Sequence, residues 1–233
     1  MIKTGLKYSL PFLLIMIGIS IWAWGAVGDD VQIVMQWGLD GSPNRYAGSR
    51  LEGIFLMPAI ALGMTFLFTV LPSIDPPGKN LKRSSSPYLV AWLGVMILLT
   101  FIHVLSMLTA AGIISGMGSE IMPTMVVGGV AILLILIGNV LGKARPNWFV
   151  GVRTPWTLSS DLSWDKTHRI TGRLMVLSGF ISLAGAIFLS GEAAVPVLIA
   201  GSAAPALFGI VYSYFVWKSD PDRVTENPDE ADI

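Results

Sequence analysis

The chain of 233 residues is 53% hydrophobic and only 13% charged, and its mean hydropathy of +0.69 excludes an ordinary soluble domain. Its formal net charge is zero, so the overall charge indicates neither nucleic acid nor an acidic partner. Cysteine is absent, which excludes disulfides and thiol chemistry. The composition predicts an integral membrane protein.

Six apolar runs are long enough to be transmembrane helices, because about 20 residues at roughly 1.5 Å each cross the hydrocarbon core of a bilayer. In chain order they are residues 8–27, 51–71, 88–110, 121–141, 174–190 and 193–217. Lipid offers no partner to an unpaired backbone amide, so the fold is predicted to be all-α. The first run also has features of a secretory signal, but its length and its Trp22 and Trp24 favour a retained anchor.

The cationic residues are distributed very unevenly between the two sides of this topology. Only Arg45 and Arg50 fall on one side, and all other Lys and Arg residues fall on the opposite side. Retained cations mark the cytoplasmic side of a membrane protein. Both termini are therefore predicted to be cytoplasmic.

The first long outer loop, residues 28–50, is predicted to be folded. Val31, Ile33 and Met35 alternate as in a short strand, and the turn-forming stretch "LDGSPNRYAGS" follows. Two roles remain open, a cover over the outer mouth of the helices and a site for an extracytoplasmic ligand. The candidate residues for either role are Trp37, Arg45, Tyr46 and Arg50.

The clearest ionisable side chain within a predicted span is His103. Such residues are functional candidates by default. Ser106 is nearby in sequence, but no third group orients a base, so we expect His103 to pack against a neighbouring helix through a hydrogen bond. Glu120 and Glu192, both predicted at the outer surface, are its candidate partners. His168 falls on the cytoplasmic side, so the two histidines are not expected to share a metal.

The other connections carry less information. Residues 111–120 and 191–192 are predicted to be turns, and residues 72–87 a flexible basic connector. The acidic tail, residues 219–233, has little to bury and is predicted to be disordered.

The connection between the fourth and fifth runs is the most informative segment. Pro146 and Pro155 are expected to interrupt helix. Ser159 or Ser160 is expected to cap a helix that begins near Asp161 and continues into the fifth span.

The first turns of that helix place distinctive pairs side by side. Asp165 and Arg169 are four residues apart and are expected to pair. Trp164 and His168 have the same spacing and share a face, and Gly172 permits close packing one turn further on.

Aromatic and cationic residues make this segment suited to the membrane surface. Aromatic and apolar side chains are expected at headgroup depth and arginines at lipid phosphates, namely Trp148, Phe149, Val152, Trp156, Arg145, Arg153 and Arg173. Two interpretations remain open, a working interfacial platform and an ordinary aromatic belt with inside-positive arginines.

The stretch "GNVLGKARPNWFVGVRTPWTLSSDLSWDKTHRITGRL", residues 138–174, resembles the signature of the SdpI family of bacterial membrane proteins. Its distinguishing pieces are Gly138-Asn139, Pro146-Asn147-Trp148-Phe149, the run "GVRTPWTLS" and Trp164 followed by "KTHR". The outer "QWGLDGSPNRYAGS" resembles a motif in a small domain of unknown function that often precedes this part of the family. Gln36-Trp37 replaces the expected histidine and aromatic residue, which argues against a metal or proton role there.

The resemblance implies a multi-pass protein of the bacterial cytoplasmic membrane that protects the membrane from a peptide toxin. It also implies signalling, in which a cytoplasmic transcriptional repressor is held at the membrane once toxin is bound outside. The expected partners are thus membrane lipids, a peptide toxin and that repressor, without direct contact to nucleic acid. The residues expected to carry binding are Asn139, Asn147, Arg153, Thr154, Pro155, Trp156, Trp164, His168 and Arg169.

Two other function classes are weighed against immunity, a transporter of small molecules or lipids and an intramembrane enzyme. Prolines within the spans favour a transporter, whereas the lack of carboxylates at mid-membrane positions opposes one. No motif for catalysis, metal or phosphate binding occurs, so we expect no catalytic residue, metal or cofactor. The expected organisation is a three-helix part at 1–110, an SdpI-like three-helix part at 111–218 and a tail at 219–233.

Overall fold

The computed structural model describes residues 1–38, 40, 42–75, 81–114, 121–189 and 191–223. The six long helices are α1 (Ile2–Ala26), α2 (Arg50–Val70), α3 (Ser85–Ala110), α4 (Ile121–Leu141), α6 (Asp161–Phe188) and α7 (Gly191–Lys218). All six are long and apolar enough to cross a membrane, which confirms the predicted all-α fold with six spans. The fifth span extends well beyond its apolar run, because its helix begins with the polar residues from Asp161 onward.

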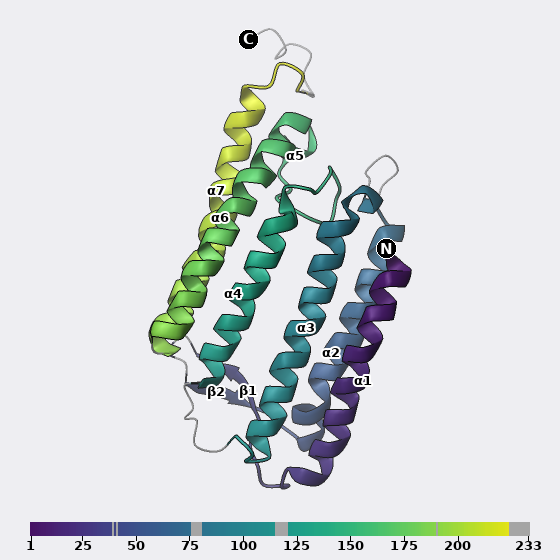
Figure 1. Cartoon of the computed structure of the whole chain (residues 1–233), viewed down its shortest axis with the longest axis vertical. Helices are drawn as coiled ribbons and strands as arrows, with labels where there is room; N and C mark the ends of the chain where they lie inside the picture. Colours follow the sequence, from purple (N-terminus) through teal and green to yellow (C-terminus); the bar gives the residue numbers. More distant parts are fainter. Residues whose placement is uncertain (39, 41, 76–80, 115–120, 190, 224–233) are drawn as a thin grey trace.

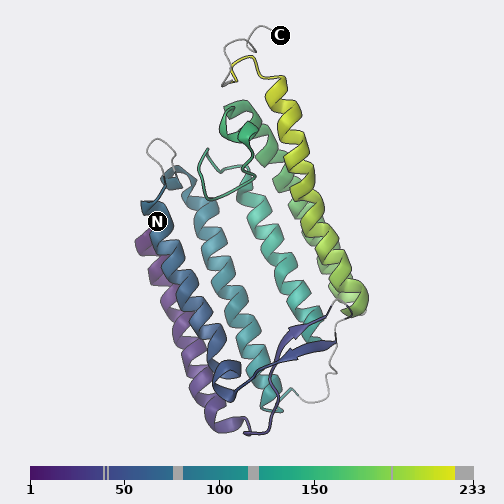
Figure 2. The same cartoon turned by 180° about the vertical axis from the view of Figure 1, so that it is seen from behind.

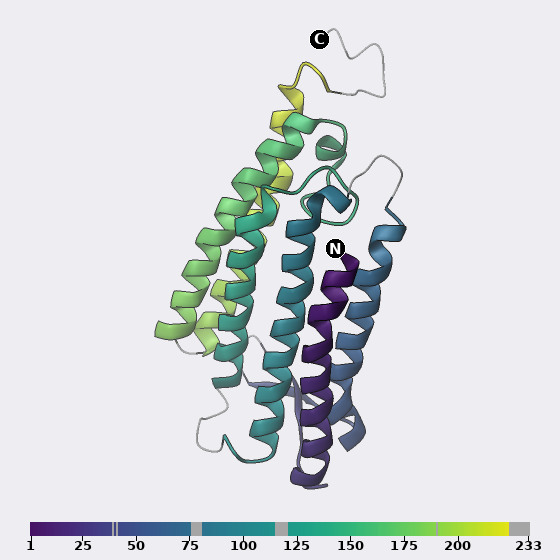
Figure 3. The same cartoon turned by 45° about the vertical axis from the view of Figure 1, so that its right-hand side comes forward.

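The helices pack in two groups that meet along α3 and α4 (Figure 1). In one group α1 contacts both α2 and α3, and in the other α4 and α7 contact α6. Figure 3 shows α3 and α4 side by side where the groups join. The division at residue 110 into an N-terminal and an SdpI-like three-helix part stays a prediction.

Aromatic packing forms the centre of the first group. Trp92, Tyr88 and Met96 of α3 are completely buried against Met16 and Ala61. The rings of Tyr88 and Trp92 meet edge to face, with centroids 6.1 Å apart. Such burial of large side chains is what orders helices that lipid alone would not hold together.

Glycine contacts bring α4 and α6 together. A Cβ at Gly138 would lie 2.7 Å from the carbonyl oxygen of Gly172, and one at Gly179 would lie 2.9 Å from that of Ala131. Only glycine permits backbones to approach so closely, as in other membrane helix pairs. The expected close packing at Gly172 is therefore confirmed.

The outer loop forms a hairpin of β1 (Val34–Trp37) and β2 (Pro43–Tyr46), which pair antiparallel. A strand was expected from the alternation of apolar residues, but it begins at Val34, since the preceding Ile33 turns inward. Ile33 is only 3% exposed and packs against Val27 and Ile54. Figure 2 shows the hairpin crossing the ends of the helices at the end of the bundle opposite the N-terminus.

The two ends of the bundle are named here by their loops. The hairpin end carries β1 and β2. The loop end carries the N-terminus, the end of α7 and the α4–α6 loop, residues 142–160, with the short helix α5 (Pro155–Leu158) (Figure 1). Two short 3-10 helices, η1 (Leu71–Ser73) and η2 (Leu81–Ser84), also lie at the loop end. The predictions for residues 76–80, for 115–120 and for the tail from 224 fall outside the described residues.

Candidate functional site

The α4–α6 loop is folded around the side chain of Asn147, which is completely buried. Its Oδ1 accepts hydrogen bonds from the backbone N–H groups of Phe149, at 2.8 Å, and Val150, at 2.7 Å. Its Nδ2 donates to the carbonyl oxygens of Arg145, at 2.7 Å, and Val150, at 3.2 Å. Asparagine suits this role because it carries both donors and an acceptor on a short side chain.

His168 of α6 holds the middle of the same loop. The backbone N–H of Val152 can only donate, so His168 Nε2, 3.0 Å away, accepts from it. The other ring nitrogen, Nδ1, lies 2.7 Å from the carbonyl oxygen of Trp164 and therefore carries the proton. Gly151 lies against the ring with a φ of +119°, and a Cβ there would be 2.0 Å from Nε2. This arrangement needs a neutral imidazole, fully enclosed and in one tautomer.

Trp164 completes this anchor from within α6. Its side chain is completely buried, and its Nε1 donates to the carbonyl oxygen of Ala144 at 2.8 Å. Its ring stacks on that of His168, with centroids 4.0 Å apart and an interplanar angle of 22°. The predicted shared face of Trp164 and His168 is confirmed, and it points into the protein.

Helix α5 begins with a capping box. The side chains of Thr154 and Thr157 each accept from the other's backbone N–H, at 3.1 and 3.0 Å. Pro155 occupies the first turn, where its missing N–H costs nothing. The expectation that Pro155 interrupts helix is thus corrected, because this proline starts one.

Helix α5 is fastened to α7. The Oγ1 of Thr154 and the Oγ of Ser213 are 2.9 Å apart. Trp156 packs edge to face against Tyr214, with ring centroids 5.2 Å apart. Ser160 caps α6, as predicted for it or its neighbour, by accepting from the N–H of Ser163.

One expected ion pair is formed by a different partner. Asp165 lies 3.7 Å from Arg145, not against Arg169 four residues along the helix. The loop brings Arg145 back over the start of α6, which the spacing within one helix did not indicate. Both side chains of the observed pair are substantially exposed, so it contributes little to stability.

The predicted binding residues therefore divide into framework and surface. Asn147, Thr154, Trp164 and His168 are buried, and Trp156 is half-buried. Exposed to the surroundings are Asn139, Arg153, Pro155 and Arg169. Arg153 donates to the carbonyl oxygen of Trp148, which is itself 46% exposed.

Sequence reasoning missed the partners that come from distant segments. Ser84 accepts from the N–H of Arg145 at 2.9 Å and donates to its carbonyl oxygen at 3.2 Å. Asp75 accepts from the N–H of Trp148 at 3.4 Å. The sequence of the connector does not predict these contacts of Ser84 and Asp75, because they form only when α3 and α4 pack together.

The hairpin end contains a cavity of about 240 Å³. It is enclosed by the hairpin and by the adjoining ends of α3 and α4, mainly through Val31–Val34, Trp37, Pro43, Ser106, Thr109, Ile121 and Met122. Of the outer candidates, Trp37 lines this cavity, whereas Arg45 pairs with Glu52 at 2.7 Å and Tyr46 is 44% exposed.

Arg50 anchors the hairpin to the helices. It pairs with Asp29, donates to the carbonyl oxygen of Val27 at 2.8 Å, and lies 4.6 Å above the ring of Trp24. At the tip of the hairpin, hydrogen bonds from the hydroxyl and N–H of Ser42 hold the pKa of the Asp40 carboxyl below its usual value.

His103 is completely buried between α1, α2 and α3. Its Nε2 lies 3.0 Å from Ser20 Oγ and 3.2 Å from the carbonyl oxygen of Met16. Ser20 in turn donates to the carbonyl oxygen of Ile54 at 3.0 Å, so its oxygen is free to accept from the histidine. The expected hydrogen bond to a neighbouring helix is present. Glu120 and the side chain of Glu192 lie outside the described residues.

Comparison with known proteins yields two family matches. Residues 143–213 match the model of the SdpI/YfhL protein family, and residues 12–62 match that of a domain of unknown function, DUF1648. The chain is also similar to the immunity protein SdpI of Bacillus subtilis (strain 168), with 27% identity over 188 residues that cover 80% of this chain and 84% of the relative. No solved structure matches the chain significantly.

The first family match begins directly after α4 and takes in the α4–α6 loop, α6 and most of α7. It includes the buried framework around Asn147, Trp164 and His168, whose residues belong to the signature stretch. The second match takes in most of α1, the hairpin and the first half of α2. The chain thus carries a segment of the SdpI/YfhL protein family at residues 143–213, preceded by the DUF1648 match, on one six-helix chain.

Proposed function

We propose that the protein is a membrane immunity protein, which binds a peptide toxin at its hairpin end. The curated relative is named for immunity, and the similarity to it covers most of both chains. The observation that carries the proposal is the cavity beneath the hairpin. It combines an apolar lining with a nearby sheet edge, which are the two features that recognise an extended peptide.

The size of the cavity favours a peptide side chain over a small-molecule substrate. At about 240 Å³ it falls below the roughly 300–1,000 Å³ of pockets that enclose a whole ligand. Within the described residues the sheet has two strands, so each strand has one edge without a partner strand. A toxin segment added along such an edge would present alternate side chains on one face, and one of them would enter the cavity.

The test fills the cavity without disturbing the hairpin surface. Ser106→Trp places a large ring in the cavity, and cells that express this variant are expected to lose protection at an unchanged membrane protein level. Phe188→Ala, at a residue that is 82% exposed and lies outside both the hairpin and the cavity lining, is the control and should protect fully. Survival is measured against a panel of secreted, membrane-active peptides. Full protection by Ser106→Trp would remove the cavity from the proposal.

The proposal requires the hairpin end to face outward. All but two of the 15 Lys and Arg residues fall on the opposite side of the predicted topology, which supports a cytoplasmic loop end and cytoplasmic termini. A cysteine at Ser42 should react with a membrane-impermeant reagent in intact cells, and a reporter fused after Asp220 should be active only in a cytoplasmic format. The reverse labelling would refute this orientation.

The loop end is proposed as the signalling surface, which holds a cytoplasmic transcriptional repressor after toxin binds. Exposed Arg153 and Trp148 are its central candidates, since they adjoin each other on the outside of the buried framework. Arg153→Gln is expected to abolish the transcriptional response to toxin while protection persists. If the response is unchanged, Arg153 has no part in signalling.

A further inference from the structure

At the loop end, α4 and α6 border an open hollow of about 360 Å³, lined in part by polar side chains, that the proposed immunity function does not use. It is lined by Gly138, Asn139, Gly142, Arg169, Gly172, Arg173 and Val176. Beside it, Gly138 and Gly172 bring the backbones of α4 and α6 into direct contact. The stem of Arg169 lies across Gly142, whose added Cβ would be 3.3 Å from Arg169 Cγ.

The two arginines of this hollow lack an anionic partner among the described residues. Arg45, Arg50 and Arg145 each have a carboxylate within 4 Å, whereas no ion pair or hydrogen bond within the described ranges involves the exposed side chains of Arg169 and Arg173. Guanidinium groups one helical turn apart suit an oxyanion with several acceptor oxygens. Asn139 adds an amide donor beside them.

A separate apolar groove lies farther along α4 and α6. Its volume is about 360 Å³, and it is lined by α3, α4 and α6 through residues that include Gly94, Phe101, Gly129, Ile132, Leu136 and Leu183. Leu136 and Asn139 are three residues apart on α4, so the groove and the hollow share one helix face. On α6 the residues Arg173, Val176, Phe180 and Leu183 follow the same spacing.

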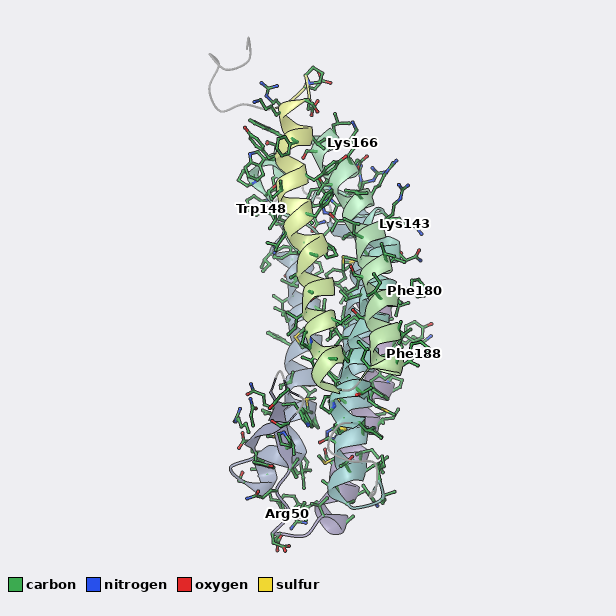
Figure 4. All side chains as sticks on the ribbon, turned by 90° about the vertical axis from the view of Figure 1, so that its left-hand side faces the viewer. Arg50, Lys143, Trp148, Lys166, Phe180 and Phe188 are labelled. Atoms are coloured by element: carbon green, nitrogen blue, oxygen red, sulfur yellow. The ribbon has the colours of Figure 1, made fainter. Side chains whose placement is uncertain are left out.

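The distance along this face matches one leaflet of a bilayer. Asn139 and Gly129 are ten residues apart on α4, which is about 15 Å at roughly 1.5 Å per residue. Half of the hydrocarbon core is also about 15 Å. Figure 4 shows Lys143 and Lys166 toward one end of the molecule and Phe180 and Phe188 farther along the same side. Cations at one end and exposed aromatic side chains below them match the headgroup and acyl layers.

We infer that this face is a binding site for one anionic phospholipid. The phosphate lies between Arg169 and Arg173 with Asn139 beside it, and an acyl chain fills the groove along Ile132 and Leu136. Lys143 and Lys166 lie nearby and add positive charge. A lipid with net negative charge therefore complements this end better than a zwitterionic one.

The experiment compares two double variants that remove the same charge. Wild-type protein in detergent is titrated with anionic and with zwitterionic phospholipid, and bound lipid is counted by native mass spectrometry. Arg169→Gln with Arg173→Gln should weaken anionic lipid binding by roughly thirtyfold, at about fivefold per basic residue. Lys143→Gln with Lys166→Gln lies outside the hollow and should weaken it by less than about fivefold, since only the general field of the surface changes.

Two further arms distinguish a lipid site from a free-phosphate site and from a diffuse basic surface. Ile132→Trp fills the acyl groove and keeps every charge, so it should also weaken lipid binding. Inorganic phosphate should fail to displace the lipid at equal concentration, because it gains nothing from the groove.

Equal losses in the two double variants, unaltered binding in Ile132→Trp, or displacement by phosphate would each overturn the inference. Thermal unfolding of each variant confirms that it is folded. None of these readouts depends on protection against toxin.

Discussion

The two ends of the bundle are anchored by different physical means. At the hairpin end, an apolar plug, Ile33, enters the helix bundle, and Arg50 binds a carboxylate, backbone carbonyls and an indole at its rim. At the loop end, buried polar side chains, with Asn147 and His168 at their centre, satisfy the backbone of a loop. An apolar contact is not directional and tolerates small shifts, whereas a network of directed hydrogen bonds specifies one loop conformation. The loop end is thus the better built to present a fixed surface.

The largest effect is expected from the tryptophan beneath the loop. Trp164→Ala removes a completely buried ring and its hydrogen bond to Ala144, so the free energy of unfolding should fall by about 3–5 kcal/mol. Trp148→Ala, at a 46% exposed tryptophan of the same loop, should cost under about 1 kcal/mol. Denaturant unfolding in detergent micelles measures both. Similar values for the two variants would mean that the loop is not anchored by Trp164.

Gly151 tests how rigidly the loop is specified. Gly151→Ala forces a side chain onto a φ of +119° and against the ring of His168, so we expect a loss of about 2–3 kcal/mol. Gly63→Ala in α2, where an added Cβ meets nothing within 4 Å, is the matched control and should be neutral or slightly stabilising. Denaturant unfolding in detergent micelles measures the stability of both variants. A neutral Gly151→Ala would show that the loop can rearrange away from His168.

Arg50 tests the contrasting anchor at the hairpin end. Arg50→Ala removes contacts with Asp29, with the carbonyl of Val27 and with the ring of Trp24, and should cost about 1–2 kcal/mol. Arg45→Ala breaks only an exposed pair with Glu52 and should change stability by less than about 0.5 kcal/mol. Equal losses of stability in the two variants would mean that the specific contacts of Arg50 do not anchor the hairpin.

The smallest effect is expected within the first helix group. His103→Gln keeps an N–H donor that can reach Ser20 Oγ, so stability should fall by about 1 kcal/mol or less and protection against toxin should persist. His103→Leu leaves the buried Ser20 oxygen without that donor and should cost more. Protection and membrane protein level are measured together. Loss of protection by His103→Gln at a normal level would give this histidine a role in function.

Sequence indicated which residues of the candidate segment lie together, but not whether they face the surface or the interior. The density of tryptophan, arginine and histidine around 146–173 identified the segment, and the Trp164–His168 spacing predicted a shared face. That face was expected to work at the surface, yet both rings are buried. Periodicity defines which side chains lie together on a helix, but another segment decides whether that side is covered. Here the returning loop at Ala144 and Val152 covers it.

Sequence by itself determined the six spans, because a bilayer imposes a minimum length of apolar residues and demands helical backbone. It also narrowed the cap of α6 to Ser159 or Ser160, of which the structure uses Ser160, since capping depends on neighbouring residues. Tertiary structure alone decided that Arg145, not Arg169, meets Asp165, and that Ser84 and Ser213 fasten the loop. These contacts join segments that are far apart in the sequence and meet only when α3, α4, α6 and α7 pack together. Local rules carry no information about such pairs, because the free energy that selects them comes from the packing of the whole bundle.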